Sequence, residues 1–211
     1  MSGPRIGVLA LQGDVREHVR VLGGLGAEAV LVRRPEELAS VDGLILPGGE
    51  SSAIDKLSRA FGMQQPIRSA IADGMPVYGT CAGLILLADR IADGIAGQES
   101  FGGMDVTVRR NAFGGQTESF ETSLDVPAVG AEPVRATFIR APIVAEAGEG
   151  VEVLARVEGG RIVAVRQGNL LGTAFHPELS GDTRFHELLL AAVRTAPRLS
   201  GPPRATGSPR A

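Results

Sequence analysis

Short apolar segments alternate with helical segments between residues 5 and 94, and this alternation most restricts the fold. Residues 14–26, 51–63 and 66–74 carry apolar side chains at helical spacing. Strands that alternate with helices predict a parallel sheet with helices on both faces. The segments with the length and composition of buried strands are RIGVLAL (5–11), AEAVLVRR (27–34), GLILP (43–47) and PVYG (76–79).

The ends of several helices are marked by polar residues. Asp14 with Glu17 three residues later resembles a capping box at the start of the first helix. AGLILLADRIA (82–92) predicts one helix that ends near Gly94. Residues 182–195 predict a closing helix, with Asp182 as its cap.

The middle of the chain has a different pattern, in which short alternating segments follow one another without helices between them. We expect several of these segments to pair in antiparallel fashion, extending or capping the main sheet. They are MDVTVRR (104–110), ESFETSL (118–124), VRATFIRA (134–141), VEVLARV (151–157), RIVAVRQ (161–167) and LLGTAF (170–175).

Residues 1–196 are predicted to form a single domain. Residues 197–211 are rich in Pro, Gly, Ser and Arg and predict a disordered tail. The formal net charge is −3, so no overall basic field would attract nucleic acid. One cysteine cannot form an internal disulfide, which favours the cytoplasm. The first apolar run is too short for a signal peptide or a membrane span.

The sole cysteine, Cys81, lies in GTCAG (79–83), where an apolar segment gives way to a helical pattern. A lone cysteine in an apolar stretch is often a small buried hydrophobic residue. Gly-x-Cys-x-Gly is also the thiol counterpart of the Gly-x-Ser-x-Gly turn, in which a strand presents a nucleophile to solvent just before a helix. The N-terminus of the following helix would favour a thiolate over a thiol.

The site hypothesis is strengthened by position, because sites in parallel α/β sheets form at the carboxyl ends of strands. Three segments punctuated by Gly or Pro fall at such ends: PGGESS (47–52), GTCAG (79–83) and FHPEL (175–179). This coincidence favours a nucleophile over a structural thiol.

His176 and Glu178 are two residues apart in HPE, so an extended backbone would place both side chains on one face. Pro177 favours that geometry for His176. A carboxylate beside an imidazole fixes its tautomer and leaves the other ring nitrogen to accept a thiol proton. The alternative is a surface turn without catalytic function.

PGGESS allows backbone N–H groups to approach a ligand closely, because Gly48 and Gly49 lack side chains. The N–H groups of Gly49 and Ala82 could form an oxyanion hole, and Glu50 could bind an ammonium group. The alternative is a simple turn in which Ser51 or Ser52 caps the next helix.

Other candidate groups point less clearly to chemistry. No metal is expected, because one Cys and three dispersed His have no ligand spacing. His18 and His186 lie on predicted amphipathic helices, as solvated or packing residues. The arginines of RRNAFGGQ (109–116) and FIRAP (138–142) could bind a substrate carboxylate or lie at solvated hairpin ends.

Six segments together resemble the class I (triad) glutamine amidotransferases. GTCAG and HPE are typical of the superfamily, and the other segments narrow the resemblance to the branch of glutaminase subunits of pyridoxal 5′-phosphate synthase. The resemblance implies a three-layer, flavodoxin-like α/β fold with a mostly parallel central sheet, helices on both faces and an additional antiparallel β region. The segments are IGVLALQGDVREH, LILPGGESS, GTCAGLILLA, RRNAFGGQ, FIRAP and FHPEL.

The resemblance implies a catalytic triad of Cys81, His176 and Glu178 that hydrolyses L-glutamine to L-glutamate and ammonia through a thioester. It implies no cofactor, and its partner is a (β/α)₈-barrel pyridoxal 5′-phosphate synthase subunit, which receives the ammonia within a large hetero-oligomer. It also settles the two arginine segments towards substrate binding. The glutamine-binding residues carried over from the family motifs are Gly48, Gly49, Glu50, Arg110, Ile139 and Arg140.

Gly115 departs from the family pattern, since relatives often carry a larger, frequently basic residue there, and the tail has no family counterpart. We expect the Gly48–Gly49 peptide to be misoriented in the free subunit and to flip on docking. Two other hypotheses remain open: a related cysteine hydrolase, such as a γ-glutamyl hydrolase or an intracellular peptidase, and a catalytically inactive scaffold. Ammonia release from glutamine, compared with peptide cleavage, would distinguish a glutaminase from a related hydrolase. Alkylation of Cys81 by a glutamine analogue would distinguish a glutaminase from an inactive scaffold.

Overall fold

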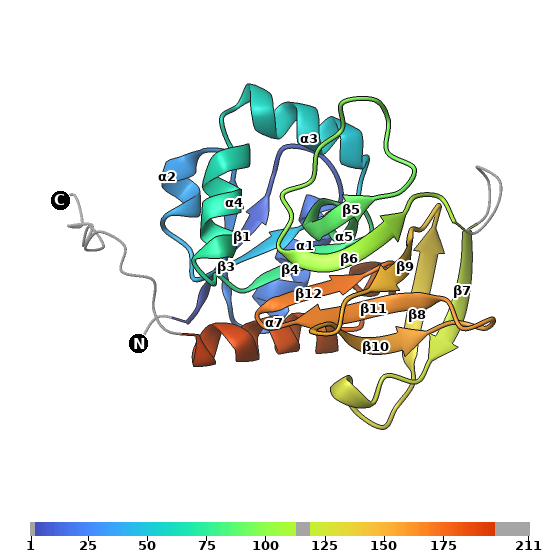
Figure 1. The fold of residues 1–211 in the computed structure, drawn as a ribbon. Coiled ribbons are helices and arrows are strands. Elements are labelled where there is room, and N and C mark those ends of the chain that lie inside the picture. Colours follow the sequence, from blue (N-terminus) through green and yellow to red (C-terminus); the bar gives the residue numbers. More distant parts are fainter. Residues whose placement is uncertain (1–2, 113–118, 197–211) are drawn as a thin grey trace.

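A ten-stranded sheet organises the fold in this computed structural model, which describes residues 3–112 and 119–196 (Figure 1). Nine of its strands follow the order β2-β1-β3-β4-β12-β11-β9-β6-β5, and β10 pairs with β11. β7 and β8 form a second, two-stranded sheet. The expected mixed architecture, with a mostly parallel central sheet and a small antiparallel sheet, is confirmed.

The parallel half of the sheet carries the alternating strands of the first part of the chain. It consists of five neighbouring strands: β2 (Glu28–Val32), β1 (Arg5–Leu9), β3 (Gly43–Leu46), β4 (Val77–Thr80) and β12 (Leu170–Thr173). Every residue of β3, β4 and β12 is buried, which accounts for their continuous apolar composition. The late strand β12 pairs in parallel with β4, so a segment far along the chain reaches the centre of the sheet.

The remaining strands form mostly antiparallel pairs, as the alternating pattern predicted; β5, β6, β9, β10 and β11 extend the main sheet, while β7 and β8 pair in the second sheet. The sequence patterns did not predict β9 as a strand. The bounds are β5 (Ala88–Ile91), β6 (Met104–Arg109), β7 (Ser119–Leu124), β8 (Val134–Ile139), β9 (Ile143–Ala147), β10 (Glu152–Arg156) and β11 (Ile162–Gln167).

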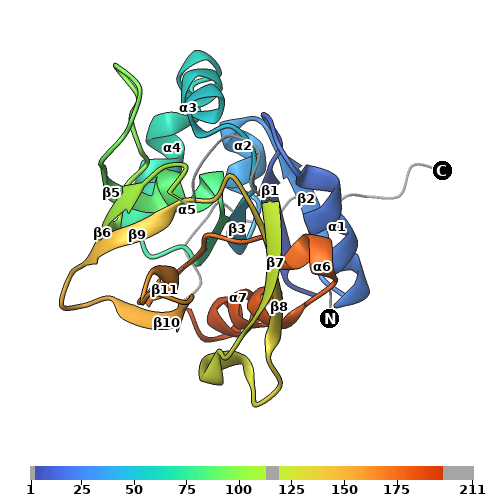
Figure 2. The same cartoon turned by 90° about the vertical axis from the view of Figure 1, so that its right-hand side faces the viewer.

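Helices cover both faces of the parallel half, with α1 and α7 on one face and α3, α4 and α5 on the other (Figures 1 and 2). The small antiparallel sheet stands beside α6 and α7 (Figure 2). The bounds are α1 (Val15–Gly24), α2 (Pro35–Leu38), α3 (Ser51–Ala60), α4 (Gln64–Ala72), α5 (Ala82–Leu87), α6 (Pro177–Ser180), α7 (Arg184–Thr195) and the short 3₁₀ helix η1 (Pro127–Val129).

Three expectations about helix ends are wrong. The predicted helix 82–92 ends at Leu87, and the chain continues as β5, because residues 88–91 pair with β6. The Asp14 side chain makes no capping hydrogen bond; its carboxylate turns towards His176 instead. The closing helix begins at Arg184 rather than at Asp182, although the Asp182 carboxylate accepts a hydrogen bond from the Arg184 N–H.

Stacked aromatic rings join the small sheet to the main core. Phe120 and Phe138 stack with centroids 4.6 Å apart, and Phe138 contacts Phe175 beside the end of β12. Phe175 in turn packs edge-on against Phe185 of α7, which stacks on Tyr78 of β4. The few aromatic residues of the chain are enough to pack the junction between the two sheets, because they concentrate there, next to the candidate site.

Candidate active site

Cys81 lies on a sharp turn between β4 and α5 and has a strained backbone, with φ 48° and ψ −100°. Its N–H donates to the Thr173 carbonyl at 2.8 Å, which ties the turn to the end of β12. The residue is 7% exposed. A non-glycine residue in this region of backbone space costs of order 1–3 kcal/mol and is typical of functional sites. This turn matches the nucleophile geometry expected for GTCAG.

The two flanking glycines are required by close packing rather than by their own backbone angles. A Cβ on Gly79 would lie 2.5 Å from the Gly83 carbonyl carbon, and a Cβ on Gly83 would lie 2.0 Å from the Leu46 carbonyl oxygen. The start of α5 therefore rests directly on the end of β3. Gly83 lets the nucleophile turn sit on the sheet, while Cys81 itself takes the positive φ.

Gly83→Ala should lower the free energy of unfolding by about 1–3 kcal/mol, because its methyl group would collide with backbone that cannot move aside. Gly23→Ala is the matched control: it lies in α1 with nothing within 4 Å of its Cβ, and should raise stability by about 0.5–1 kcal/mol. Urea unfolding of both variants tests this. Equal stability of Gly83→Ala and the unsubstituted chain would contradict the packing argument.

His176 reaches Cys81 because β12 and β4 are parallel neighbours that end side by side, with Thr173 opposite Thr80. The His176 N–H donates to the Thr137 carbonyl at 2.9 Å, which fixes the segment against β8. The imidazole Nδ1 lies 2.8 Å from Glu178 Oε1, and the Cys81 side chain is close enough to raise the pKa of the same ring. The structure therefore brings Cys81, His176 and Glu178 together.

The route by which Glu178 faces His176 differs from the expectation of an extended HPE segment. His176 precedes α6, and Glu178 lies in the first turn of this helix with Pro177 at its first position. The turn, rather than extended backbone, brings the carboxylate back to the ring. Proline suits this position because its missing N–H would have no helical partner there.

The pKa of His176 is raised to about 10. Burial alone would lower it, but hydrogen bonds to Cys81 and Glu178, and the negative charges of both groups, outweigh the burial. His176 is 3% exposed and the Glu178 side chain is 0% exposed, so these interactions are little screened by water. A protonated imidazole is thus held between a sulfur and a carboxylate.

Asp14 is a second carboxylate at this ring, which the sequence analysis missed. Its Oδ2 lies 3.6 Å from His176 Nδ1, and burial raises its pKa against the opposing effect of His176. The signal was present, because QGD directly follows the predicted strand 5–11 and the carboxyl ends of parallel strands share one edge.

The Gly48–Gly49 segment packs tightly against the histidine and the turn after β1. A Cβ on Gly48 would lie 2.3 Å from His176 Cε1, and a Cβ on Gly49 would lie 2.5 Å from Gln12 Oε1. The Asp14 N–H donates to the Gly48 carbonyl at 3.1 Å. Gly49 has φ 150°, a conformation that favours glycine. Ala82, the other predicted oxyanion donor, is the buried first residue of α5.

Glu50 caps α3 and faces Arg110. Its carboxylate accepts hydrogen bonds from the Ser52 and Ala53 N–H groups and from the Ser52 hydroxyl, so Glu50 is the cap rather than Ser51 or Ser52. Arg110 lies 2.9 Å from Glu50 Oε1. These contacts bring two of the predicted glutamine-binding residues into one ion pair at the edge of the site.

The segments of Arg110 and Arg140 form adjacent turns. The Ala112 N–H donates to the Ala141 carbonyl at 3.1 Å, and Arg140 has a positive φ of 44°. Ile139 ends β8, two residues after the Thr137 carbonyl that holds His176. Both turns thus lie beside the triad, with the Ile139 and Arg140 side chains exposed. Gly115 lies outside the described residues.

Asp14, His176 and Glu178 also each offer one atom that could bind a metal, and these atoms lie within 4.8 Å of one another. His176 Nδ1 and Glu178 Oε1 are already hydrogen-bonded to each other. The hydrogen bond accounts for their proximity, and the residues fit an acid–base site without an ion.

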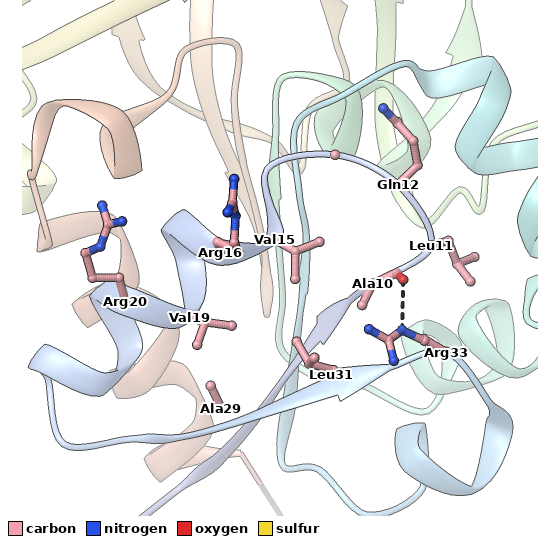
Figure 3. Close-up of a pocket in the computed structure, with 11 residues that line it drawn as sticks. Ala10, Leu11, Gln12, Val15, Arg16, Val19, Arg20, Ala29, Leu31 and Arg33 are labelled. Carbon is pink, nitrogen blue, oxygen red and sulfur yellow. Dashed lines mark hydrogen bonds between the residues drawn. The ribbon is translucent and has the colours of Figure 1, made fainter.

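A cavity of about 600 Å³ is lined by residues of the turn after β1, of α1 and of β2 (Figure 3). Figure 3 shows its apolar floor of Val19, Ala29 and Leu31, with three arginines around it. Gln12 lines this cavity and also accepts a hydrogen bond from the Glu50 N–H at 2.9 Å. None of the three triad residues lines it, so the cavity adjoins the site without containing it.

Comparison with known proteins decides the family. The sequence pattern of the SNO glutamine amidotransferase family matches residues 8–195. This chain belongs to the SNO glutamine amidotransferase family. The resemblance inferred from the sequence is confirmed, and the matched range includes every residue assigned to the site.

Two curated relatives of this SNO family chain are named "Pyridoxal 5′-phosphate synthase subunit PdxT". The protein of Leifsonia xyli subsp. xyli is 69% identical over 194 residues, covering 92% of this chain and 98% of the relative. The protein of Streptomyces avermitilis is 61% identical over 194 residues, covering 92% and 96%.

Solved structures agree with the fold. A crystal structure of a glutamine amidotransferase superimposes with a TM-score of 0.84 at 47% identity, covering 90% of this chain and 99% of that chain. PurLQS from Thermotoga maritima gives a TM-score of 0.68 at 18% identity, covering 90% and 99%, a likeness of fold alone.

Proposed function

We propose that this SNO family chain is the glutaminase subunit of a pyridoxal 5′-phosphate synthase, and that it hydrolyses L-glutamine to L-glutamate and ammonia. The observation that carries the proposal is a buried site in which one ring, His176, is hydrogen-bonded to Glu178 and has its pKa raised by the nearby Cys81. The names of the relatives and the family match support the assignment to this branch.

Catalysis begins with the Cys81 thiolate, which attacks the side-chain amide carbon of glutamine and forms a carbon–sulfur bond. Glu178 occupies Nδ1 of His176, which leaves Nε2 for the thiol and the leaving group. The amide oxygen becomes an oxyanion, for which the N–H groups of Gly49 and Ala82 are the proposed donors.

The tetrahedral intermediate then collapses and breaks the carbon–nitrogen bond. The His176 imidazolium donates its Nε2 proton to the leaving nitrogen, which departs as ammonia and leaves a γ-glutamyl thioester on Cys81. The neutral ring next takes a proton from water, and the resulting hydroxide attacks the thioester. Glutamate leaves and the thiolate–imidazolium pair is restored.

The glutamine-binding role proposed for Gly48, Gly49, Glu50, Arg110, Ile139 and Arg140 is supported by their grouping around the triad. Arg110 already pairs with Glu50, so one guanidinium can hold the Glu50 carboxylate in place for the glutamine ammonium group. The close packing around Gly48 and Gly49 leaves no room for a Cβ at either position. The loop therefore carries no side chain there that would block a substrate as small as glutamine.

We further propose that a (β/α)₈-barrel synthase subunit receives the ammonia in the cytoplasm, within a hetero-oligomer. Within residues 3–112 and 119–196, no helix is long and apolar enough to cross a bilayer.

The structure shows which hydrogen bond the expected flip of the Gly48–Gly49 peptide would affect. Turning this peptide must break the hydrogen bond from the Asp14 N–H to the Gly48 carbonyl.

Partner dependence can be tested with the full chain and the synthase subunit of the same organism. We expect ammonia release from glutamine to rise at least about tenfold on mixing, because docking reorients the Gly48–Gly49 peptide into donor geometry. Glutamine-dependent cofactor formation should appear only in the mixture. Equal turnover by the isolated chain would contradict the flip, and absence of ammonia release from the mixture would contradict the proposed function.

A further inference from the structure

Two histidines that the proposed chemistry does not use lie buried behind Glu178. His18 of α1 and His186 of α7 are both 0% exposed, so the expectation that they pack is confirmed and the alternative of solvated residues is wrong. His18 Nδ1 lies 2.9 Å from His186 Nε2. His18 Nε2 lies 3.2 Å from Thr80 Oγ1 and 3.5 Å from Glu178 Oε1.

Both histidines are neutral at neutral pH. The pKa of His18 lies well below its usual value because of burial and the nearby His186 and His176. Burial lowers the pKa of His186 to about 4, against the opposing effect of Asp182. Two neutral imidazoles in contact must share one proton between Nδ1 of the first and Nε2 of the second.

The surroundings select the tautomers. If His18 donated from Nδ1, its Nε2 lone pair would face the Glu178 carboxylate, and the buried Nδ1–H of His186 would have no partner among the described residues. If His186 donates from Nε2 instead, His18 carries its proton on Nε2 and directs it towards Thr80 and Glu178. The second arrangement leaves only an acceptor unsatisfied, which proteins tolerate better than an orphaned N–H.

We propose that His18, held in its Nε2–H tautomer by His186, is a positioning residue for Glu178. Oε2 of Glu178 has no hydrogen-bond partner in the described part of the chain, so the carboxylate depends on the groups around Oε1 for its orientation. His18 provides a neutral N–H 3.5 Å from Oε1, the same oxygen that His176 Nδ1 contacts at 2.8 Å. This inference rests on the proposed glutaminase function.

A neutral donor suits this place better than a cation. A protonated His18 would compete with His176 for the charge of Glu178 and would weaken the imidazolium that the reaction needs. The titratable groups that face Glu178 are His176 after β12, His18 of α1, Asp14 before α1 and Tyr78 of β4. Behind His18, the Tyr78 ring lies edge-on to both histidines and keeps this region apolar.

The test compares His18→Leu with His18→Gln in the full chain saturated with its synthase partner. Leucine removes the donor, while glutamine restores an N–H at a similar distance along the side chain. We expect His18→Leu to lower kcat about 10- to 100-fold with KM changed less than about twofold. The alkaline limb of the pH profile should move down by about half to one pH unit, because a displaced Glu178 no longer supports the His176 imidazolium. His18→Gln should recover most of both.

Two further variants separate positioning from packing. Leu22→Val trims a neighbouring buried residue of α1 that lies outside this chain of polar groups, and should lower stability without moving the pH profile. His186→Leu keeps His18 but removes the group that sets its tautomer, so it should shift the same limb by a smaller amount. If His18→Leu does not fold, His186→Leu still tests the positioning role through the same shift of the alkaline limb.

The outcomes are distinct. An inactive unsubstituted complex would refute the proposed function itself. An active complex whose alkaline limb stays unchanged in both His18→Leu and His186→Leu would overturn the positioning role. Failure of both leucine variants to fold, with His18→Gln folded but inactive, would also overturn it, because a side chain that supplies the same N–H would then fail to restore activity.

Discussion

Cys81→Ala should lose glutaminase activity by at least about 10⁴-fold, because no other group can form the thioester. The fold should survive, since alanine fits the space of the thiol and has the same backbone restrictions at φ 48°. Ammonia release from glutamine, measured with the synthase partner present, checks the expected loss. Activity within tenfold of the unsubstituted complex would refute Cys81 as the nucleophile.

The control for this variant is binding rather than activity. Cys81→Ala should co-elute with the synthase subunit as the unsubstituted chain does and should unfold at a similar temperature. Because the chain has one cysteine, uptake of a glutamine-analogue alkylating agent reports on this residue alone. The unsubstituted chain should take up one equivalent and the variant none.

His176→Ala should cost about as much as loss of the nucleophile, whereas Glu178→Gln should cost only about 10²- to 10³-fold. The alanine variant has neither the base for thiol and water nor the acid for the leaving ammonia. The glutamine side chain can still accept the Nδ1–H hydrogen bond, so orientation is kept while the charge that stabilises the imidazolium is lost. Steady-state kcat for the two variants gives the comparison.

The same prediction has a pH signature. Since the pKa of His176 is raised to about 10, the imidazolium persists through neutral pH and is lost as the pH rises through that value. Glu178→Gln lowers this pKa, so its alkaline loss of activity should begin at lower pH. Glu152→Gln, which removes an exposed carboxylate of β10 paired with Arg166, should leave the profile unchanged. A larger loss in Glu178→Gln than in His176→Ala would refute the assigned roles.

Local sequence patterns predicted the parallel core and the nucleophile turn because both depend on neighbours in the chain. Short apolar strands between amphipathic helices have few ways to bury their surfaces, and GTCAG needs small residues at fixed positions wherever it occurs. Helix boundaries were less predictable. The segment 82–92 has a helical pattern throughout, yet pairing with β6 turns its second half into a strand.

Asp14 and His18 show what local patterns miss. Asp14 has the spacing of a helix cap, but the neighbouring strand end places His176 within reach of its carboxylate. His18 fits an amphipathic helix equally well as a packing residue, and only the contact of α1 with α6 and α7 places it behind Glu178. Such roles depend on residues more than a hundred positions away.

By itself, the sequence determined the class of fold and the family and predicted the nucleophile and its base, because each is encoded in contiguous residues whose chemistry and spacing are visible. Only the tertiary structure decided how these groups meet. The parallel pairing of β12 with β4 delivers His176 to Cys81, and the packing of α1 and α7 encloses Glu178. Long-range pairing of this kind arises from burial and strand order, which no short segment contains.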